Sequence, residues 1–306
     1  QAHYDRCGID AEVSAEQLNG IYRSKYRLKE QPLVSVIIPN KDHTEDLDKC
    51  IRSIEEKGTY KNIEYIVIEN NSQKKETFAY YEKLQAENPK VKVVFWEREF
   101  NYSAINNYGV GFAKGEYLLF LNNDTEIINP DCIEELLGYC MRDDVGIVGA
   151  RLYYEDDTIQ HVGVIIGLGG VAGHTFVGEP KDSLGYFGRI VTAQDYSAVT
   201  AACLMTKRKV FEKVNGFEEK LAVAFNDVDF CLKVREAGYL VVYNPYAELH
   251  HYESKSRGLE DTEEKVLRFQ GEIRTFQYRW KEILNEGDPY YSPNLTLDKT
   301  DFSLRI

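Results

Sequence analysis

The chain has 306 residues, of which 43% are hydrophobic and 28% are charged, as in an ordinary folded globular protein with ample core. Its formal net charge of −13 argues against a wide nucleic-acid-binding face, and no apolar run approaches the roughly 18 residues that span a bilayer. Six cysteines without any C-x-x-C pair favour reduced, mostly buried thiols in a cytoplasmic protein over a zinc site or a disulfide framework.

In chain order, residues 1–31 come first. They are polar and weakly periodic, so we expect a linker or the tail of a preceding domain. After Pro32, short apolar runs alternate with segments of helical spacing. The predicted strands are 34–38, 63–68, 91–95 and 117–121, and the predicted helices are 47–54, 76–87 and 103–114. This alternation predicts an α/β fold, in which a mostly parallel, Rossmann-like sheet carries helices on both faces.

Beyond residue 145 the alternation weakens. Glycines are frequent between Gly163 and Gly173, and we expect a mixed region that is laid against the first half. Apolar residues at spacings of three and four then predict one long packing helix over 266–283. The last residues, 286–306, are expected to form an extended tail.

Polar clusters follow the four predicted strands, at the point where each strand ends. They are Asn40-Lys-Asp42, Glu69-Asn-Asn-Ser72, Glu99-Phe-Asn101 and Asn122-Asn-Asp124. Parallel sheets bind their ligands outside the carboxyl ends of the strands, because these ends meet at one edge. The sequence therefore predicts a binding site at this edge.

Two carboxylates of these clusters suit a nucleotide. Asp124 is well placed to hold Mg²⁺ or Mn²⁺ beside a diphosphate, since hard cations prefer oxygen ligands. Glu69 can accept the N3–H of uracil or thymine, which cytosine lacks. Structural alternatives stay open for both, because an aspartate in a turn often caps a helix and Glu69 stands in a turn-forming cluster.

Residues 225–231 read Phe-Asn-Asp-Val-Asp-Phe-Cys and open a predicted helix. We interpret Asn226 as its N-cap. Asp227 lies in the first turn, where the helix dipole favours a carboxylate. Asp229 lies about 200° around the helix from Asp227, so the two point in different directions and at least one is spare for acid–base chemistry.

The histidines are the remaining candidates. His250 and His251 are adjacent at a predicted strand end, and only one of them can face a site because neighbouring side chains of a strand point to opposite faces. His161 and His174 lie in glycine-rich segments. They either line an acceptor pocket or are satisfied structural histidines, and the sequence leaves both interpretations open.

Seven stretches together resemble the large inverting family-2 glycosyltransferases with the GT-A fold. The similarity is greatest to the bacterial branch that builds O-antigen and other rhamnose-rich surface polysaccharides. The stretches are 32–39 (PLVSVIIP), 66–72 (IVIENNS), 100–107 (FNYSAINN), 120–126 (FLNNDTE), 159–163 (IQHVG), 224–231 (AFNDVDFC) and 251–258 (HYESKSRG). They follow the family's order and spacing, and the resemblance covers the chain from residue 32 to near its end.

The resemblance implies a role for each matching residue. Pro39, Asn40, Asp42 and Glu69 would line the nucleobase and ribose, and Asn101 and Asn107 would face the donor's diphosphate or sugar. Asn123-Asp124 would stand for the family's Asp-x-Asp motif in the donor site, and Asp124 and His251 would hold Mn²⁺ or Mg²⁺. Asp227 would be the general base. On the acceptor side we expect His161, His174 and Asn226.

The resemblance also implies a division of the chain and a reaction. Residues 32–285 would form the GT-A domain, with the nucleotide-binding half at 32–126, the acceptor half at 127–258 and the C-terminal helix at 259–285. A sugar, with rhamnose as the leading interpretation, would pass with inversion from a dTDP- or UDP-linked donor to a saccharide or lipid-linked saccharide. We expect this in the bacterial cytoplasm, at the inner face of the membrane if the full-length protein associates with it peripherally, and without a nucleic-acid partner.

Departures from the family pattern leave alternatives open. Glu69 stands where Asp is usual, Asn122 and Asn123 stand where acidic residues are common, and Ala201 stands where Gly is usual. The two asparagines leave Asp124 with fewer charged helpers, which would weaken metal binding. Rival functions are a nucleotidyltransferase, although the loop after the first strand is not glycine-rich, and an inactive carbohydrate-binding module that kept the fold.

Overall fold

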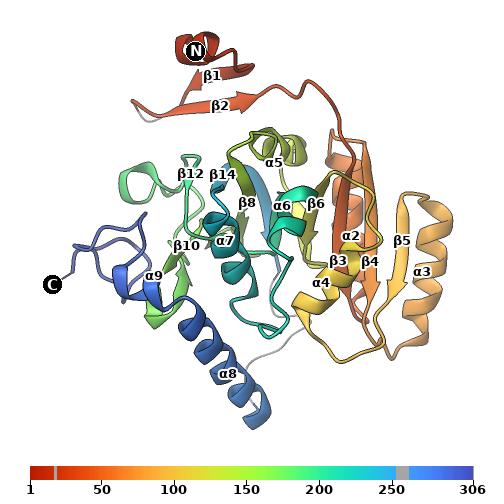
Figure 1. Cartoon of the computed structure of the whole chain (residues 1–306). Coiled ribbons are helices and arrows are strands. Elements are labelled where there is room, and N and C mark those ends of the chain that lie inside the picture. Colours follow the sequence, from red (N-terminus) through yellow and green to blue (C-terminus); the bar gives the residue numbers. More distant parts are fainter. Residues whose placement is uncertain (17–18, 253–261, 306) are drawn as a thin grey trace.

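A twisted, mostly parallel sheet runs through the centre of the structure, a computed structural model that describes residues 1–16, 19–252 and 262–305 (Figure 1). Its strands are, in spatial order, β12 (Gln194–Asp195), β14 (Leu240–His251), β8 (Val145–Tyr153), β13 (Cys203–Lys207), β6 (Tyr117–Leu121), β3 (Val34–Asn40), β4 (Ile63–Glu69) and β5 (Val91–Phe95). β13 runs antiparallel to β6 and β8, and the short β12 runs antiparallel to β14. The four strands predicted first, β3 to β6, are all present and parallel.

Helices cover both faces of this sheet, because its strands are apolar on both sides. In β6, Leu118 and Phe120 enter one hydrophobic core, and Leu119 and Leu121 enter the other. The core around Phe120 is closed by α4 (Tyr102–Val110), α6 (Arg208–Lys213) and α7 (Asn226–Glu236). The other core is closed by α2 (Thr44–Arg52) with a π-helical turn at Ser53–Lys57, α3 (Lys75–Glu87) and α5 (Cys132–Cys140). The predicted α/β fold class is confirmed.

Short strands make the second half mixed, as expected. They are β7 (Thr125–Ile127), β9 (Ile159–His161), β10 (Val164–Ile166) and β11 (Ala172–His174), with single helical turns at Leu168–Gly170 and Tyr186–Gly188. β10 pairs only with β11 among the named strands, whereas β7 adds to β14 and β9 adds to β8. The pairing of β7 with β14 sets His251 opposite Thr125, at the carboxyl edge of the sheet.

Residues 1–31, expected to be a linker or a tail, have regular structure. α1 (Ala2–Cys7) is followed by a hairpin of β1 (Ala11–Ala15) and β2 (Tyr22–Tyr26), which Figure 1 shows above α5. Arg23 of this hairpin donates to Glu135 of α5 at 2.6 Å, and the Tyr26 ring packs edge-on against Tyr139. The sequence pattern missed the hairpin because its strands are polar and only half-buried.

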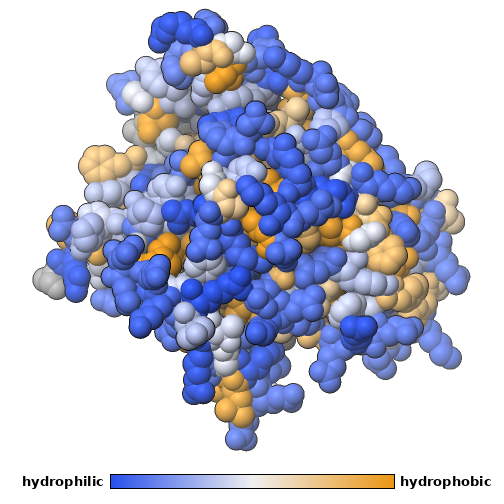
Figure 2. Space-filling view, viewed as in Figure 1, coloured by the Kyte–Doolittle hydropathy of each residue, from blue (hydrophilic) through white to orange (hydrophobic). Residues whose placement is uncertain are grey.

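The single helix expected over 266–283 is two helices, α8 (Glu263–Arg279) and α9 (Lys281–Glu286). They break at Trp280, whose indole N–H donates to the buried carboxylate of Asp229 at 2.9 Å. Phe276 is fully buried, so α8 is a packing helix along this part, but Figure 2 shows hydrophobic surface at its free end, where Val266 and Leu267 are exposed.

The tail after α9 has little regular structure, and it packs back on the molecule. Phe302 stacks on Phe176 with ring centroids 4.8 Å apart, and Leu295 forms a bridge with Leu304. All six cysteines are free thiols and five of them are buried, as the composition predicted. Among the described residues no helix is long and apolar enough to cross a membrane.

Candidate active site at the carboxyl edge of the sheet

The polar clusters at the ends of β3 and β6 meet at one edge, as the sequence predicts. The amide of Asn123 donates to Oδ1 of Asn40 at 2.5 Å, and the amide of Asn40 donates to the hydroxyl of Tyr81 at 2.8 Å. Both asparagines are buried. These hydrogen bonds link β3, β6 and α3, and we call the polar surface formed by Asn40, Asn123 and Tyr81 the polar floor of the site.

Glu69 lies on this floor, at the end of β4, and is buried. Its carboxylate accepts hydrogen bonds from the backbone N–H of Ser72, from the Ser72 hydroxyl at 2.6 Å and from the Tyr81 hydroxyl at 2.6 Å. A carboxylate has about four acceptor positions, so these three donors leave room for about one more. Binding of a nucleobase by Glu69 stays a prediction, and it would use this remaining position.

The side chain of Asp42 stabilises the local backbone. Its backbone is left-handed with φ of 56°, and its carboxylate accepts from the backbone N–H groups of Gln73 and Lys74 and from the Thr77 hydroxyl. Burial raises the pKa of Asp42, but these hydrogen bonds outweigh it and hold the pKa below its ordinary value. Asp42 therefore fixes the start of α3, and a ribose contact from Asp42 or from the half-buried Pro39 stays a prediction.

Asn101 and Asn107 also have structural partners. Asn101 caps α4 by accepting from the N–H of Ala104 at 2.9 Å, and its amide donates to the carbonyl of Glu219. Asn107 exchanges two hydrogen bonds with the backbone of Phe217. These contacts tie α4 to the segment before α7, and no described contact turns either amide toward Asp124.

Asp124 and His251 meet at this edge although 127 positions separate them in the printed numbering. Their Oδ1 and Nε2 atoms are 3.2 Å apart, because the pairing of β7 with β14 brings His251 beside the turn that carries Asp124. Burial raises the pKa of Asp124, but the hydrogen bond and charge of His251 outweigh it and lower the pKa below its ordinary value. His250 points the other way, to the exposed Asp157, which confirms that only one of the two histidines faces the site.

This pair fits part of a divalent cation site. One carboxylate oxygen and one imidazole nitrogen are ligands that Mn²⁺ accepts in proteins. In the described part of the chain no group of three or more His, Cys, Asp or Glu residues is arranged to hold a metal. A cation bound by Asp124 and His251 would therefore need further oxygen ligands from a bound diphosphate or from water.

The side chains of Asp227 and Asp229 point in different directions, as the sequence indicated. Asp227 is half-buried, and its Oδ2 accepts from the N–H of Ala201 at 3.1 Å. Ala202, the next residue, accepts from the N–H of Asn122, so Asp227 stands near the turn that carries Asp124. Asp229 is fully buried and bonded to Trp280, with Arg279 3.2 Å away.

The interpretation of Asn226 as an N-cap is wrong. The cap position is Phe225, with a left-handed φ of 60°, and the amide of Asn226 donates to the carbonyl of Val223 at 2.9 Å. The N–H of Val223 instead binds the carboxylate of Glu272, on α8. Left-handed backbone in a non-glycine residue is strained and persists where its surroundings fix it. Here Phe225 stacks on Phe269 of α8, so α8 holds the turn before Asp227.

His161 and His174 lie together, with ring centroids 4.7 Å apart. Nε2 of the buried His161 accepts from the N–H groups of Gly163 and Thr200, both at 3.3 Å. Its Nδ1 is buried without a hydrogen-bond partner among the described residues. Burial, with smaller effects of His174 and His251, lowers the pKa of His161 well below its ordinary value, so the ring is neutral. The acceptor roles expected for His161, His174 and Asn226 stay predictions.

Gln160 is a residue that the sequence analysis passed over. Its side chain contacts His251 at two points, and its backbone carbonyl is 3.2 Å from Nδ1 of His174. The signal in the sequence was its place beside His161 in the stretch Ile159-Gln-His-Val-Gly163. The rest of the stretch 251–258 cannot be placed, since residues 253–258 lie outside the described residues.

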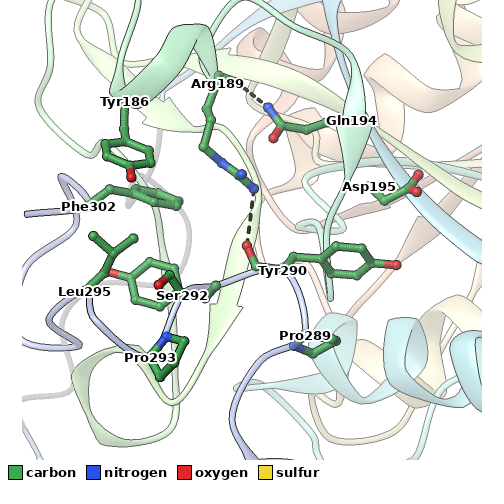
Figure 3. Close-up of a pocket in the computed structure, with 11 residues that line it drawn as sticks. Tyr186, Arg189, Gln194, Asp195, Pro289, Tyr290, Ser292, Pro293, Leu295 and Phe302 are labelled. Atoms are coloured by element: carbon green, nitrogen blue, oxygen red, sulfur yellow. Dashed lines mark hydrogen bonds between the residues drawn. The ribbon is translucent and has the colours of Figure 1, made fainter.

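Two cavities flank the second half. One of about 480 Å³ is mostly apolar and is lined by His174 and by Phe225, which stands two positions before Asp227. The other, of about 630 Å³, lies under the C-terminal tail, where Figure 3 shows Arg189 pointing toward the carbonyl of Tyr290. β12 borders this cavity and pairs with β14 at Val242 and Tyr243, roughly 25 Å along the strand from His251. The first cavity is the one near the candidate site.

Comparison with known sequences gives matches over nearly the whole chain. The profile of glycosyl transferase family 2 matches residues 35–214. The uncharacterized protein y4gI of Sinorhizobium fredii is 47% identical over 284 residues, which are 92% of this chain and 31% of that protein. The O-antigen biosynthesis protein RfbC of Myxococcus xanthus is 37% identical over 99% of this chain and 23% of its own length. This chain thus spans less than a third of either relative.

A shorter match and two solved structures complete the comparison. An N-acetylglucosaminyl-diphospho-decaprenol L-rhamnosyltransferase of Mycobacterium tuberculosis is 37% identical over 60 residues, 20% of each chain. GalNAc-T7, solved with UDP, GalNAc and Mn²⁺, has a TM-score of 0.65 and 14% identity over 83% of this chain and 50% of its own. Mannosyltransferase PcManGT of Pyrobaculum calidifontis, solved with GDP-Man and Mn²⁺, has a TM-score of 0.56 and 15% identity over 75% of this chain and 59% of its own. The fold is GT-A.

Proposed function

We propose that this chain, which belongs to glycosyl transferase family 2, transfers a sugar from a nucleoside diphosphate to a saccharide acceptor with inversion. The observation that carries the proposal is the meeting of Asp124 and His251, 3.2 Å apart, at the carboxyl edge of the sheet. Asp227 stands at the same edge, joined to it through Ala201 and Ala202. A cation-binding pair and a separate carboxylate are what a displacement at a sugar carbon requires.

The nucleotide would lie over the ends of β3 and β4. Asn40 and Asn123 form the floor there, and Glu69 has about one acceptor position left for the N3–H of uracil or thymine. Asp42 would act mainly by holding the start of α3 beside the base. We therefore propose UDP- or dTDP-linked donors, with rhamnose as the leading sugar because the Mycobacterium relative is named an L-rhamnosyltransferase.

Asp124 and His251 would hold the divalent cation, Mn²⁺ or Mg²⁺. When bound, it supplies Lewis-acid neutralisation of the charge that develops on the leaving diphosphate. The two structural neighbours were solved with Mn²⁺, which supports this choice of cofactor. The chain's own contribution is to keep a carboxylate oxygen and an imidazole nitrogen 3.2 Å apart in a buried place.

Asp227 would be the general base. In an inverting transfer the acceptor hydroxyl oxygen forms the new bond to the anomeric carbon as the bond to the diphosphate breaks, and the hydroxyl proton passes to a carboxylate. Asp227 is half-buried and bonded to backbone N–H groups at both oxygens, which fixes its orientation. Asp229 cannot take this role, because it is buried against Trp280.

The acceptor would occupy the cavity that includes His174 and Phe225. Its mostly apolar wall suits the ring face of a deoxysugar or the start of a lipid-linked saccharide. We propose that the full-length protein works in bacterial surface-polysaccharide synthesis, on the cytoplasmic side of the membrane and in peripheral contact with it. The name of the Myxococcus relative, an O-antigen biosynthesis protein, supports the role in polysaccharide synthesis.

An inactive carbohydrate-binding module and a nucleotidyltransferase are the rival functions. The purified chain should be incubated with Mn²⁺ and UDP-, dTDP-, CDP- or GDP-sugars, with thermal stabilisation and release of free nucleoside diphosphate as readouts. Stabilisation by a UDP or dTDP donor with slow release of the diphosphate is expected. An inactive module would release none, and a nucleotidyltransferase would instead make the nucleotide sugar from a sugar phosphate and a nucleoside triphosphate.

A further inference from the structure

Gln160 occupies the middle strand position of β9, between the two sides of the candidate site, and is buried. Its side chain reaches His251 on the metal side. Its backbone carbonyl lies 3.2 Å from Nδ1 of His174, on the acceptor side. The neighbouring His161 accepts from the N–H of Thr200, next to the Ala201 that binds Asp227. β9 therefore contacts the metal side and the acceptor side of the candidate site.

The orientation of the Gln160 amide follows from its contacts. Its Nε2 donates to the backbone carbonyl of His251 at 3.1 Å, and a carbonyl oxygen can only accept. The other amide atom, Oε1, must then face Nδ1 of the His251 ring, at 2.6 Å. Because Oε1 is an acceptor, Nδ1 has to carry the proton.

The protonation of Nδ1 also determines the state of Nε2, the second nitrogen of the His251 ring. With the proton on Nδ1, a neutral His251 presents the lone pair of Nε2 at the other end of the ring. This Nε2 is 3.1 Å from the amide nitrogen of Asn122, which can donate to it, and 3.2 Å from Oδ1 of Asp124. In this neutral ring two acceptors, a carboxylate oxygen and an imidazole nitrogen, face the same point. A second proton on Nε2, which lets the ring donate to Asp124, satisfies both, and so does a cation that takes the Nε2 lone pair in place of the Asn122 N–H.

We propose that Gln160 is a positioning residue, which holds His251 in the Nδ1–H tautomer and aims its Nε2 at the cation beside Asp124. Histidine ligands in metal sites commonly donate their other ring N–H to a carbonyl or carboxylate, and loss of that partner costs about 10- to 100-fold in metal affinity or activity. The inference rests on the proposed function for the cation, but the state of the ring can be measured without it.

Two substitutions separate positioning from packing. Gln160→Met keeps the length of the side chain but has no acceptor for Nδ1–H, whereas Gln160→Glu keeps an acceptor and loses the donor to the His251 carbonyl. The matched control is Gln85→Met. Gln85 is also a glutamine whose Oε1 accepts one proton, from the N–H of Val93 at 3.0 Å, but on the α3 side of the molecule.

The first measurement is the tautomer of His251 in metal-free protein, read from ¹⁵N shifts and long-range ¹H–¹⁵N couplings of ¹⁵N-histidine-labelled samples. The second is Mn²⁺ affinity in the presence of UDP, measured by electron paramagnetic resonance. Wild type and Gln85→Met should show Nδ1–H at His251. Gln160→Met should lose this preference and bind Mn²⁺ about 10- to 100-fold more weakly, and Gln160→Glu should recover most of both.

The outcomes distinguish the inference from the function on which it rests. If wild type binds no Mn²⁺ but Gln160→Met still shifts the tautomer, the metal role fails and the positioning role stands. If His251 carries its proton on Nε2 in wild type, or if Gln160→Met leaves the tautomer unchanged, the inference is overturned whatever the metal does.

Discussion

The carboxylates on the two sides of the site are bonded differently. On the proposed nucleotide side, Glu69 accepts three hydrogen bonds and Asp42 binds two backbone N–H groups and a hydroxyl. On the proposed reaction side, Asp227 accepts one backbone N–H at each oxygen, and Asp124 contacts only His251 among the described side chains.

This difference separates two uses of a carboxylate. A carboxylate whose acceptor positions are nearly all used by protein donors stabilises the chain around it, and few of its positions remain for a ligand. One with open positions can take up a cation or a proton during a reaction. The comparison therefore ranks the four residues by how much chemistry each can perform.

The comparison is tested most severely at Asp227. Asp227→Asn keeps the size of the side chain but cannot take a proton, so turnover should fall by about 10²- to 10⁴-fold while donor affinity barely changes. The transfer rate and the donor dissociation constant should be measured together.

Asp229→Asn is the matched control, two residues along the same helix. It should leave turnover largely intact and lower the free energy of unfolding by about 1.5–3 kcal/mol, because it weakens buried hydrogen bonds to a charged group. An inactive Asp229→Asn beside an active Asp227→Asn would mean that the wrong carboxylate has been assigned.

A substitution of Asp124 tests whether its open acceptor positions bind a cation. Asp124→Ala should remove the rise in donor affinity that Mn²⁺ produces, since it deletes one of the two protein groups that can bind the ion. Calorimetric titration of the donor with Mn²⁺ and with EDTA measures the effect. His250→Ala, on the opposite face of β14, serves as the control, and full wild-type turnover in EDTA would contradict the prediction.

A substitution of Glu69 tests whether a carboxylate with nearly all acceptor positions occupied still contacts the nucleobase. Glu69→Gln should weaken UDP or dTDP binding by about one to two powers of ten, because a hydrogen bond to a charged group contributes roughly 1.5–3 kcal/mol. Tyr81→Phe removes an internal partner of Glu69 without removing its charge, and it should affect binding less. Equal affinity of the wild type for CDP and UDP would rule out the base contact.

The smallest effect is expected at Glu126, a surface carboxylate of β7 bonded by Lys57, Lys49 and Tyr252. Burial raises its pKa, but these partners outweigh it and lower the pKa from 4.5 to about 2. Because the pKa of Glu126 is lower in the folded state, its ionised carboxylate stabilises the folded protein above pH 4.5, and this contribution is lost as the pH falls toward 2. Urea unfolding of Glu126→Gln should therefore depend less on pH in this window than that of wild type, and equal slopes would contradict this.

The sequence by itself determined the elements whose pattern is local. Apolar runs of strand length predicted β3 to β6, and the order of strands and helices predicted the α/β sheet. The period of two along a strand required that only one of His250 and His251 face inward, and the 100° step of a helix separated Asp227 from Asp229. These rules hold wherever the segment lies, because they depend on backbone geometry alone.

The tertiary structure decided what depends on contacts between distant segments. The pairing of β7 with β14 places His251 beside Asp124, which the family resemblance implied but no spacing in the chain encodes. The half-buried hairpin of residues 1–31 has no apolar period to reveal it, and the helix break at Trp280 follows from its bond to Asp229. Asn226 fails as a cap because Phe225 is held left-handed by α8. Each of these outcomes is set by a partner far along the chain, which local propensity cannot see.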